Sequence, residues 1–175
     1  SVGQGAADND DDTPVSIFHP SYLILAAGIF TAFVAGDLFN LYVGFEVLLS
    51  ASFVLLTIGA SEERVRAGIS YVMVSMVSSL IFLIGLALIY AATGTLNMAE
   101  LSLRLHDISG GTRGALFAVL LVAFAIKAAV FPLSAWLPDS YPTAPAPVTA
   151  VFAGLLTKVG VYAIIRAHSL LFPAG

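Results

Sequence analysis

Long apolar segments alternate with short polar or proline-rich stretches along most of the chain. The segments run from Tyr22 to about Gly36, Leu38 to about Ala60, Ala67 to about Ala92, near Gly114 to Pro132, and about Pro147 to Leu170. A helix needs roughly 20 apolar residues to cross a bilayer. The first segment reaches that length if its helix begins one turn earlier. The pattern predicts an all-α integral membrane protein with five transmembrane helices.

The fourth segment contains a proline close to a lysine, within FAIKAAVFPLSAWLPD. Pro132 removes a backbone hydrogen bond, and its ring collides with the carbonyl four residues earlier, so the helix kinks or breaks there. Broken helices at membrane depth are stable only where protein or a water-filled cavity satisfies the freed groups, and transporters place their sites at such breaks. We therefore expect a fourth helix that is discontinuous at Pro132.

Composition agrees with a membrane setting. The chain is 59% hydrophobic and 10% charged, which an ordinary soluble core does not accommodate. It contains no cysteine, which excludes disulfide frameworks, thiolate metal sites and cysteine nucleophiles. Much of the net charge of −4 comes from an acidic N-terminal stretch that lacks apolar periodicity. We assign residues 1–20 to an acidic, solvent-exposed tail or loop and residues 21–175 to a five-helix transmembrane repeat.

Two junctions carry local helix signals. Asp37 precedes the second apolar segment, where its carboxylate can accept hydrogen bonds from free backbone N–H groups as an N-cap. The stretch NMAELSLRLH, residues 97–106, has leucines at mixed spacing with polar interruptions, which is typical of a short interfacial helix. We expect such a helix between the third and fourth spans.

Glu46 lies deep within the second apolar segment. At about 1.5 Å per residue, its carboxylate sits roughly 12 Å inside a helix about 34 Å long, near the bilayer middle. Tyr42, Ser50 and Thr57 recur with it at helical spacing and predict a polar stripe that faces protein or water. A carboxyl kept protonated for packing alone is the alternative, but burying a charge-bearing group is a costly way to fill space.

Two lysines lie at similar depth on other segments. Lys127 is about 20 Å into the fourth segment, and Lys158 lies near the middle of the fifth, between Gly154 and Gly160. A charged side chain at the bilayer centre costs about 2.5–3.5 kcal/mol on insertion scales, so such residues mark ion or proton pathways. Snorkelling of the lysines to the nearer interface is the alternative reading.

The third segment carries a stripe of hydroxyl groups, comprising Tyr71, Ser75, Ser78 and Ser79. Small hydroxyl residues usually serve helix packing in membranes. A second reading is that the hydroxyls hold water beside Glu46. We keep Tyr71, Ser75 and Ser79, with the stripe on the second segment, as possible support for a proton relay.

These residues predict a proton relay. At about 4 Å and an effective dielectric near 20, an opposite charge contributes on the order of 4 kcal/mol, enough to decide whether a buried lysine holds its proton. We hypothesise that Glu46 pairs with Lys127 and keeps it charged. Loosening that pair then lets the proton pass through water and hydroxyls toward Lys158.

At these residues the chain resembles a known family. The motifs are GDLFNLYVGFEVLLSASFVLL, FAIKAAVFPLSAWLPDSYPTAPAPVTA and GLLTKVGVYAIIR. They are similar to the antiporter-like subunits of respiratory complex I and of Mrp-type cation/proton antiporters, the Mrp D subunit above all. The resemblance implies a five-helix repeat with a discontinuous fourth helix, and it carries the family's key glutamate and lysines onto Glu46, Lys127 and Lys158. Family members have a second, inverted repeat that has no counterpart here, so we expect that this chain does not transport alone.

Three functions fit these observations. The first is a proton/cation translocation subunit, or part of one, in a multi-subunit Na⁺/H⁺ antiporter. The second is a proton-pumping membrane subunit of NADH-quinone oxidoreductase or a membrane-bound hydrogenase, and the third is a structural bundle or assembly factor without transport. No flavin, nucleotide or metal-ligand motif is evident, so we expect no cofactor, no metal and no catalytic residue; at most the chain is the non-redox part of an oxidoreductase.

The same reasoning predicts the surroundings of the chain. We expect a multi-pass protein of the cell membrane whose partners are other membrane subunits and the lipid bilayer, with protons and Na⁺ as transported ions and no nucleic acid. The two possible orientations are not distinguished, because arginines occur in similar number on both predicted sides.

Overall fold

A computed structural model of the chain describes residues 15–58, 61–129 and 150–172. The helices are α2 (Val15–Val34), α3 (Leu38–Thr57), α4 (Glu62–Thr93), α5 (Met98–Arg104), the 3₁₀ turn η1 (Leu105–Asp107), α6 (Gly110–Lys127), the π-helical turn η2 (Phe152–Leu156), α9 (Thr157–Arg166) and the π-helical turn η3 (Ala167–Leu171). No named strand occurs among the described residues, so the all-α prediction is confirmed for them.

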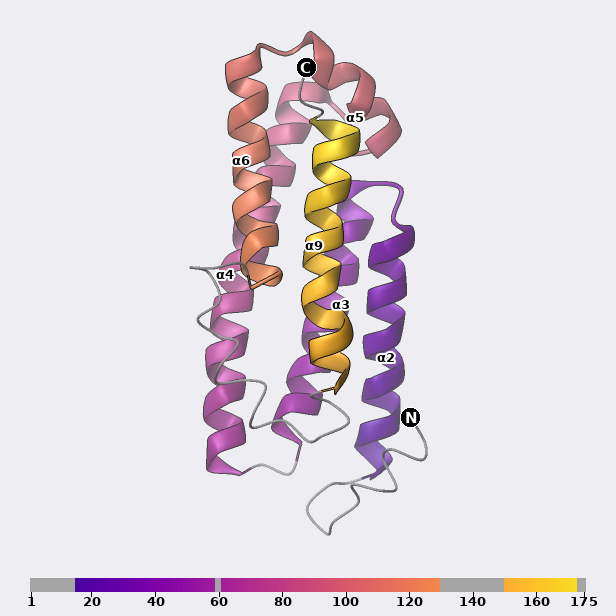
Figure 1. Ribbon diagram of the computed structural model, residues 1–175, viewed down its shortest axis with the longest axis vertical. Helices are drawn as coiled ribbons and strands as arrows, with labels where there is room; N and C mark the ends of the chain where they lie inside the picture. The colour runs from indigo at the N-terminus through magenta and orange to yellow at the C-terminus, as the bar shows by residue number, and fades with distance from the viewer. Residues whose placement is uncertain (1–14, 59–60, 130–149, 173–175) are drawn as a thin grey trace.

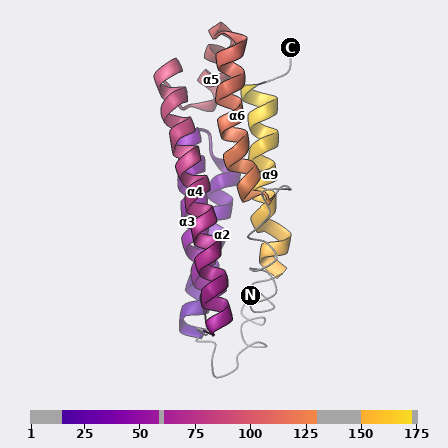
Figure 2. The ribbon, with the colours of Figure 1, turned by 90° about the vertical axis from the view of Figure 1, so that its left-hand side faces the viewer.

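The long helices form an elongated bundle (Figure 1). α3 lies between α2 and α4, α6 packs along α4, and α9 contacts both α6 and α2. In the view turned by 90°, α4 and α6 run side by side along one face of the bundle (Figure 2). α5 lies at the end of the bundle where α9 leads into η3, away from the start of α2 (Figure 1).

Four of the described helices are long and apolar enough to cross a membrane. They cover Ser16–Val34, Leu38–Thr57, Val65–Thr93 and Gly110–Lys127. The fifth expected span is helical over residues 152–171, where π-helical turns flank the ten-residue α9. The described residues therefore contain four candidate membrane spans by length and composition, and the count of five spans stays a prediction. The expected break at Pro132 lies outside the described residues.

The first helix begins before Tyr22, where the first apolar segment starts. α2 starts at Val15 and contains Pro20, so the predicted boundary at residue 20 falls inside a helix. Phe18 explains the extension, since its side chain is only 2% exposed and its ring stacks on Tyr22 at a centroid distance of 6.0 Å. Burial of the Phe18 ring stabilises the helical turn before Pro20 against the bundle.

The connections at one end of the bundle hold each other in place. The carboxylate of Asp37 accepts a hydrogen bond from the Asn40 N–H at 2.7 Å, which confirms the predicted N-cap of α3. The backbone of Leu38 donates to the Leu96 carbonyl at 2.9 Å and pairs this junction with the one before α5. The short helix expected over residues 97–106 is present as α5 and η1. Its place at the membrane interface remains a prediction.

Three phenylalanines from three helices form an aromatic cluster at the centre of the core. Phe45 of α3, Phe82 of α4 and Phe124 of α6 are each at most 1% exposed. Their ring centroids lie 4.9 to 6.2 Å apart, within the range in which aromatic pairs attract beyond their area burial. The cluster fixes the rotation of α3, α4 and α6 relative to one another, so it determines which neighbouring side chains face inward.

Candidate functional site

Polar side chains from the same three helices lie directly beside the aromatic cluster. Ser79 precedes Phe82 by three residues, and Lys127 follows Phe124 by three residues. Residues three apart are neighbours on a helix surface, so each polar group is carried to the edge of the cluster by its phenylalanine. Glu46 directly follows Phe45, the third phenylalanine of the cluster, in the sequence.

The hydroxyl group of Ser79 joins Glu46 to Lys127. It donates a hydrogen bond to Oε1 of Glu46, and it accepts one from the Lys127 Nζ at 3.2 Å. The ion pairs found among the described residues do not include one between these two side chains. The charges that sequence reasoning expected to pair directly are thus linked through a hydroxyl from a third helix. Both are half-buried.

Lys127 sits where α6 ends. It is the last residue of the helix, and Ala129 just beyond it has a left-handed backbone with φ 53°. α6 stops part-way along α4, well short of the far end of the bundle (Figure 1). The free carbonyls of a helix C-terminus carry partial negative charge and stabilise a cation there. The Phe45 ring, 5.0 Å from Nζ, adds a cation–π contact.

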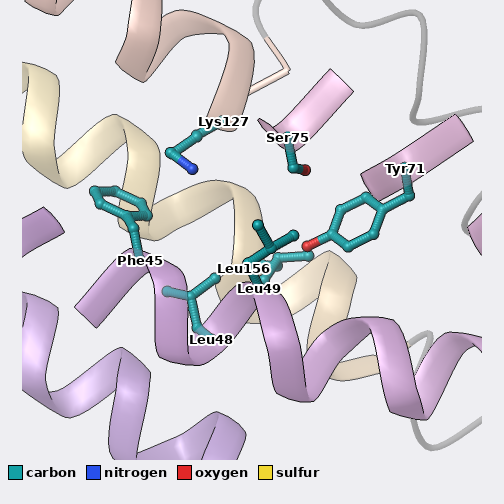
Figure 3. Close-up of a pocket in the computed structure, with 7 residues that line it drawn as sticks. All are labelled: Phe45, Leu48, Leu49, Tyr71, Ser75, Lys127 and Leu156. Atoms are coloured by element: carbon teal, nitrogen blue, oxygen red, sulfur yellow. The ribbon is translucent and has the colours of Figure 1, made fainter. Parts of the chain in front are cut away.

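A small cavity lies beside Lys127. Its volume is about 20 Å³, and its polar lining consists of Lys127, Ser75 and Tyr71. The ammonium group and both hydroxyl groups point toward the space between these helices (Figure 3). A cavity of this size with several polar partners holds about one water molecule. The Tyr71 hydroxyl also hydrogen-bonds Ser52 at 2.7 Å, which extends the polar path deeper into the bundle.

The C-terminal helix closes this region by packing against the end of α6. A Cβ added to Gly160 would lie 2.6 Å from the backbone N of Ala128, so only glycine permits this approach. Leu156, the last residue of the π-helical turn η2, lines the cavity. Such turns are frequent at functional sites. Lys158 follows directly on α9; its side chain is exposed, and it is not among the residues that line the cavity.

The predicted polar stripe on α3 does not converge on the site as a unit. The hydroxyls of Ser50 and Thr57 donate to carbonyls of their own helix, at 3.0 Å to Glu46 and 2.8 Å to Phe53. The ring of Tyr42 packs edge-on against Phe82, at a centroid distance of 5.6 Å. Of the possible support residues, Tyr71, Ser75 and Ser79 are the ones whose hydroxyls reach the lysine or its cavity.

Sequence reasoning missed one hydroxyl group of this region, that of Ser52, which bonds Tyr71. Ser52 follows Phe45 by seven residues, and that spacing places it on the same buried face of α3. Ser78, a member of the hydroxyl stripe on the third segment, donates to the Ala123 carbonyl at 2.8 Å and so joins α4 to α6. The described residues contain no group of three or more histidines, aspartates or glutamates that could hold a metal ion.

Comparisons with known proteins agree with this architecture. The family described as NADH:quinone oxidoreductase/Mrp antiporter, TM, matches residues 35–175. The D subunit of the Na(+)/H(+) antiporter of Alkalihalophilus pseudofirmus is 46% identical over 156 residues, covering 89% of this chain and 32% of that protein. The D subunit of a probable K(+)/H(+) antiporter of Rhizobium meliloti is 49% identical over 158 residues, covering 89% of this chain and 29% of that protein. The chain thus spans about a third of the length of these relatives.

Two solved structures share the fold. The Mrp complex from Dietzia sp. DQ12-45-1b matches with a TM-score of 0.81 and 42% identity, over 87% of this chain and 29% of that one. The membrane-bound sulfane sulfur reductase, an archaeal respiratory membrane complex, matches with a TM-score of 0.80 and 37% identity, over 83% of this chain and 30% of the matched chain. Together with its four membrane-length helices, these matches make the chain part of a multi-pass membrane protein. It belongs to the NADH:quinone oxidoreductase/Mrp antiporter transmembrane family.

Proposed function

We propose that this chain forms the proton-handling portion of a membrane subunit that exchanges protons for a monovalent cation, as part of a multi-subunit Na⁺/H⁺ antiporter. The observation that supports it best is the hydroxyl-bridged pair of Glu46 and Lys127 beside a water-sized cavity, inside a bundle of membrane-length helices. The antiporter subunits among its relatives support the same class of activity.

The pair acts by setting where a proton rests. A nearby opposite charge favours the charged form of an amine, and the helix C-terminus and the Phe45 ring, 5.0 Å from Nζ, add to this effect. Movement that separates Glu46 from Lys127 removes part of that stabilisation, and the ammonium group then releases its proton. A water molecule in the adjacent cavity is the acceptor, with Ser75 and Tyr71 orienting it.

Lys158 is the next proton-accepting group in the proposed relay. It follows the cavity-lining Leu156 by two residues on the same helical run, and the close packing of Gly160 on Ala128 holds that run against the end of α6. A small shift of this helix, next to the π-helical turn η2, brings the second amine toward the cavity. Other membrane subunits supply the remainder of the pathway and the site for Na⁺, in the cell membrane.

A redox-driven proton pump is the second candidate. The fold matches a membrane-bound sulfane sulfur reductase as closely as it matches an Mrp complex, so the same bundle suits a respiratory complex. The subunits that co-purify with the native protein separate the two: small antiporter subunits support the first function, and quinone- or sulfur-reducing subunits support the second.

The test is transport by the native membrane complex reconstituted in vesicles, with a pH-sensitive dye inside and a Na⁺ gradient applied. We expect Glu46→Ala to abolish proton movement while the complex still assembles. Glu62→Ala is the matched control, because the Glu62 side chain is 89% exposed at the start of α4. The complex that carries this variant should transport protons normally. Undiminished transport by the Glu46 variant would show the proposal to be wrong.

A further inference from the structure

The Ser79 hydroxyl stands between two groups with opposite hydrogen-bonding needs. A serine hydroxyl has one hydrogen to donate and lone pairs to accept with. In the structure it donates to the Glu46 carboxylate and accepts from the Lys127 ammonium group. A carboxylate only accepts and an ammonium group only donates, so this is the arrangement that satisfies both charged groups at once.

Loss of the proton from Lys127 changes what the hydroxyl can do. A neutral amine has a lone pair, which makes it an acceptor as well as a donor. The single hydrogen of Ser79 can then turn from Glu46 to the lysine nitrogen, but it cannot serve both. Rotation about the Cβ–Oγ bond is all that the change requires, and the hydroxyl keeps its own proton throughout.

We propose that Ser79 is a positioning residue whose hydroxyl couples the protonation of Lys127 to the hydrogen bonding of Glu46. This inference rests on the proposed function and adds a switch to it. When the lysine is charged, Ser79 holds the carboxylate in place. When the lysine is neutral, the hydroxyl turns to it and the carboxylate is released, so the pair re-forms only when the lysine is protonated again.

Burial makes this hydroxyl hard to replace. Ser79 is only 6% exposed, so bulk water has no ready access to take over its two hydrogen bonds. The titratable groups that face it are Glu46 from α3 and Lys127 from α6, and Tyr42 precedes the glutamate by one helical turn. On its own helix, Tyr71 and Ser75 line the cavity beside the lysine.

Ser78 provides a matched comparison within the same helix. It is fully buried, and its hydroxyl donates to the Ala123 backbone carbonyl at 2.8 Å, so this hydrogen bond joins α4 to α6 through an uncharged group. A purely structural serine should behave like Ser78, affecting assembly and stability alone. A coupling serine should also change how transport depends on pH.

The experiment compares Ser79→Ala, Ser79→Thr and Ser78→Ala in the reconstituted native complex, with the rate of proton transport measured across a range of pH. Removing a hydrogen bond to charged groups should lower the rate on the order of tenfold and move the pH profile in Ser79→Ala. Ser79→Thr keeps the hydroxyl and should retain the original profile. Ser78→Ala should leave the profile in place, whatever it does to the yield of complex.

Two results would overturn the inference. One is a Ser79→Ala complex with the rate and pH profile of the unsubstituted protein; the other is an equal displacement of the profile by Ser78→Ala. Glu46→Ala separates this failure from failure of the proposed function. If that variant is inactive while Ser79→Ala is normal, only the switch is wrong. If both transport normally, the relay itself is wrong.

Discussion

Replacing Gly160 by alanine tests whether the C-terminal helix packs directly on the end of α6, beside Lys127. The added Cβ would lie 2.6 Å from the backbone N of Ala128 and 2.9 Å from its Cα and Cβ. These atoms belong to the backbone and the first side-chain carbon, so they cannot turn away. One helix must move to accept the methyl group.

Gly154→Ala on the same helical run is the control. An alanine Cβ there meets no heavy atom of the described residues within 4 Å. Alanine is favoured over glycine by up to about 1 kcal/mol in an α-helix such as α9, which contains Gly160, whereas overpacking a close contact costs about 1–3 kcal/mol. Gly154 lies in the π-helical turn η2, so this control reports the effect of an added methyl group where the surrounding space is open. We expect Gly160→Ala to be the less stable by about 1–3 kcal/mol.

The assay is thermal unfolding of the purified native complex in detergent, followed by transport in vesicles. The unfolding midpoint of Gly160→Ala should fall below that of the unsubstituted protein, and that of Gly154→Ala should match or exceed it. Transport should be impaired in the first variant alone, since displacing Ala128 displaces the neighbouring lysine. Equal midpoints for the two variants would refute the close packing of α9 on α6.

Two further predictions concern single hydrogen bonds. Asp37→Ala removes the N-cap of α3 and should lower the free energy of unfolding by about 0.5–2 kcal/mol, whereas Asp37→Asn keeps an acceptor and should change it little in chemical denaturation. Tyr71→Phe should lower the free energy of unfolding by about 1 kcal/mol. Because the Tyr71 and Ser52 hydroxyls bond each other, the double variant Tyr71→Phe, Ser52→Ala should lose less stability than the sum of the two single variants. Strict additivity would argue against that bond.

Much of the fold could be predicted from the sequence because its signals are local. Apolar segments of membrane length predicted the long helices, and an aspartate directly before an apolar segment predicted the N-cap at Asp37. The apolar pattern starts at Tyr22 and needed a helix that begins one turn earlier to reach membrane length. α2 begins at Val15, and burial of Phe18 in the bundle, a tertiary effect, accounts for the residues before Pro20.

The candidate site was predicted less completely, for a geometric reason. Position along a helix gives depth, and depth placed Glu46, Lys127 and Lys158 at a similar level. Which side chains meet at that level depends on how each helix is rotated, and the aromatic cluster sets that rotation. The bridge through Ser79 therefore emerged only from the structure, as did the absence of Lys158 from the lining of the cavity.

A double-mutant cycle on proton transport tests the central claim that Glu46 and Lys127 work as one unit. The rates of Glu46→Gln, Lys127→Met and the double variant are measured in the same reconstituted complex. Groups that act together are strongly non-additive, so we predict that each single change costs nearly as much activity as both together. Losses that simply multiply, with the double variant far slower than either single variant, would contradict the account.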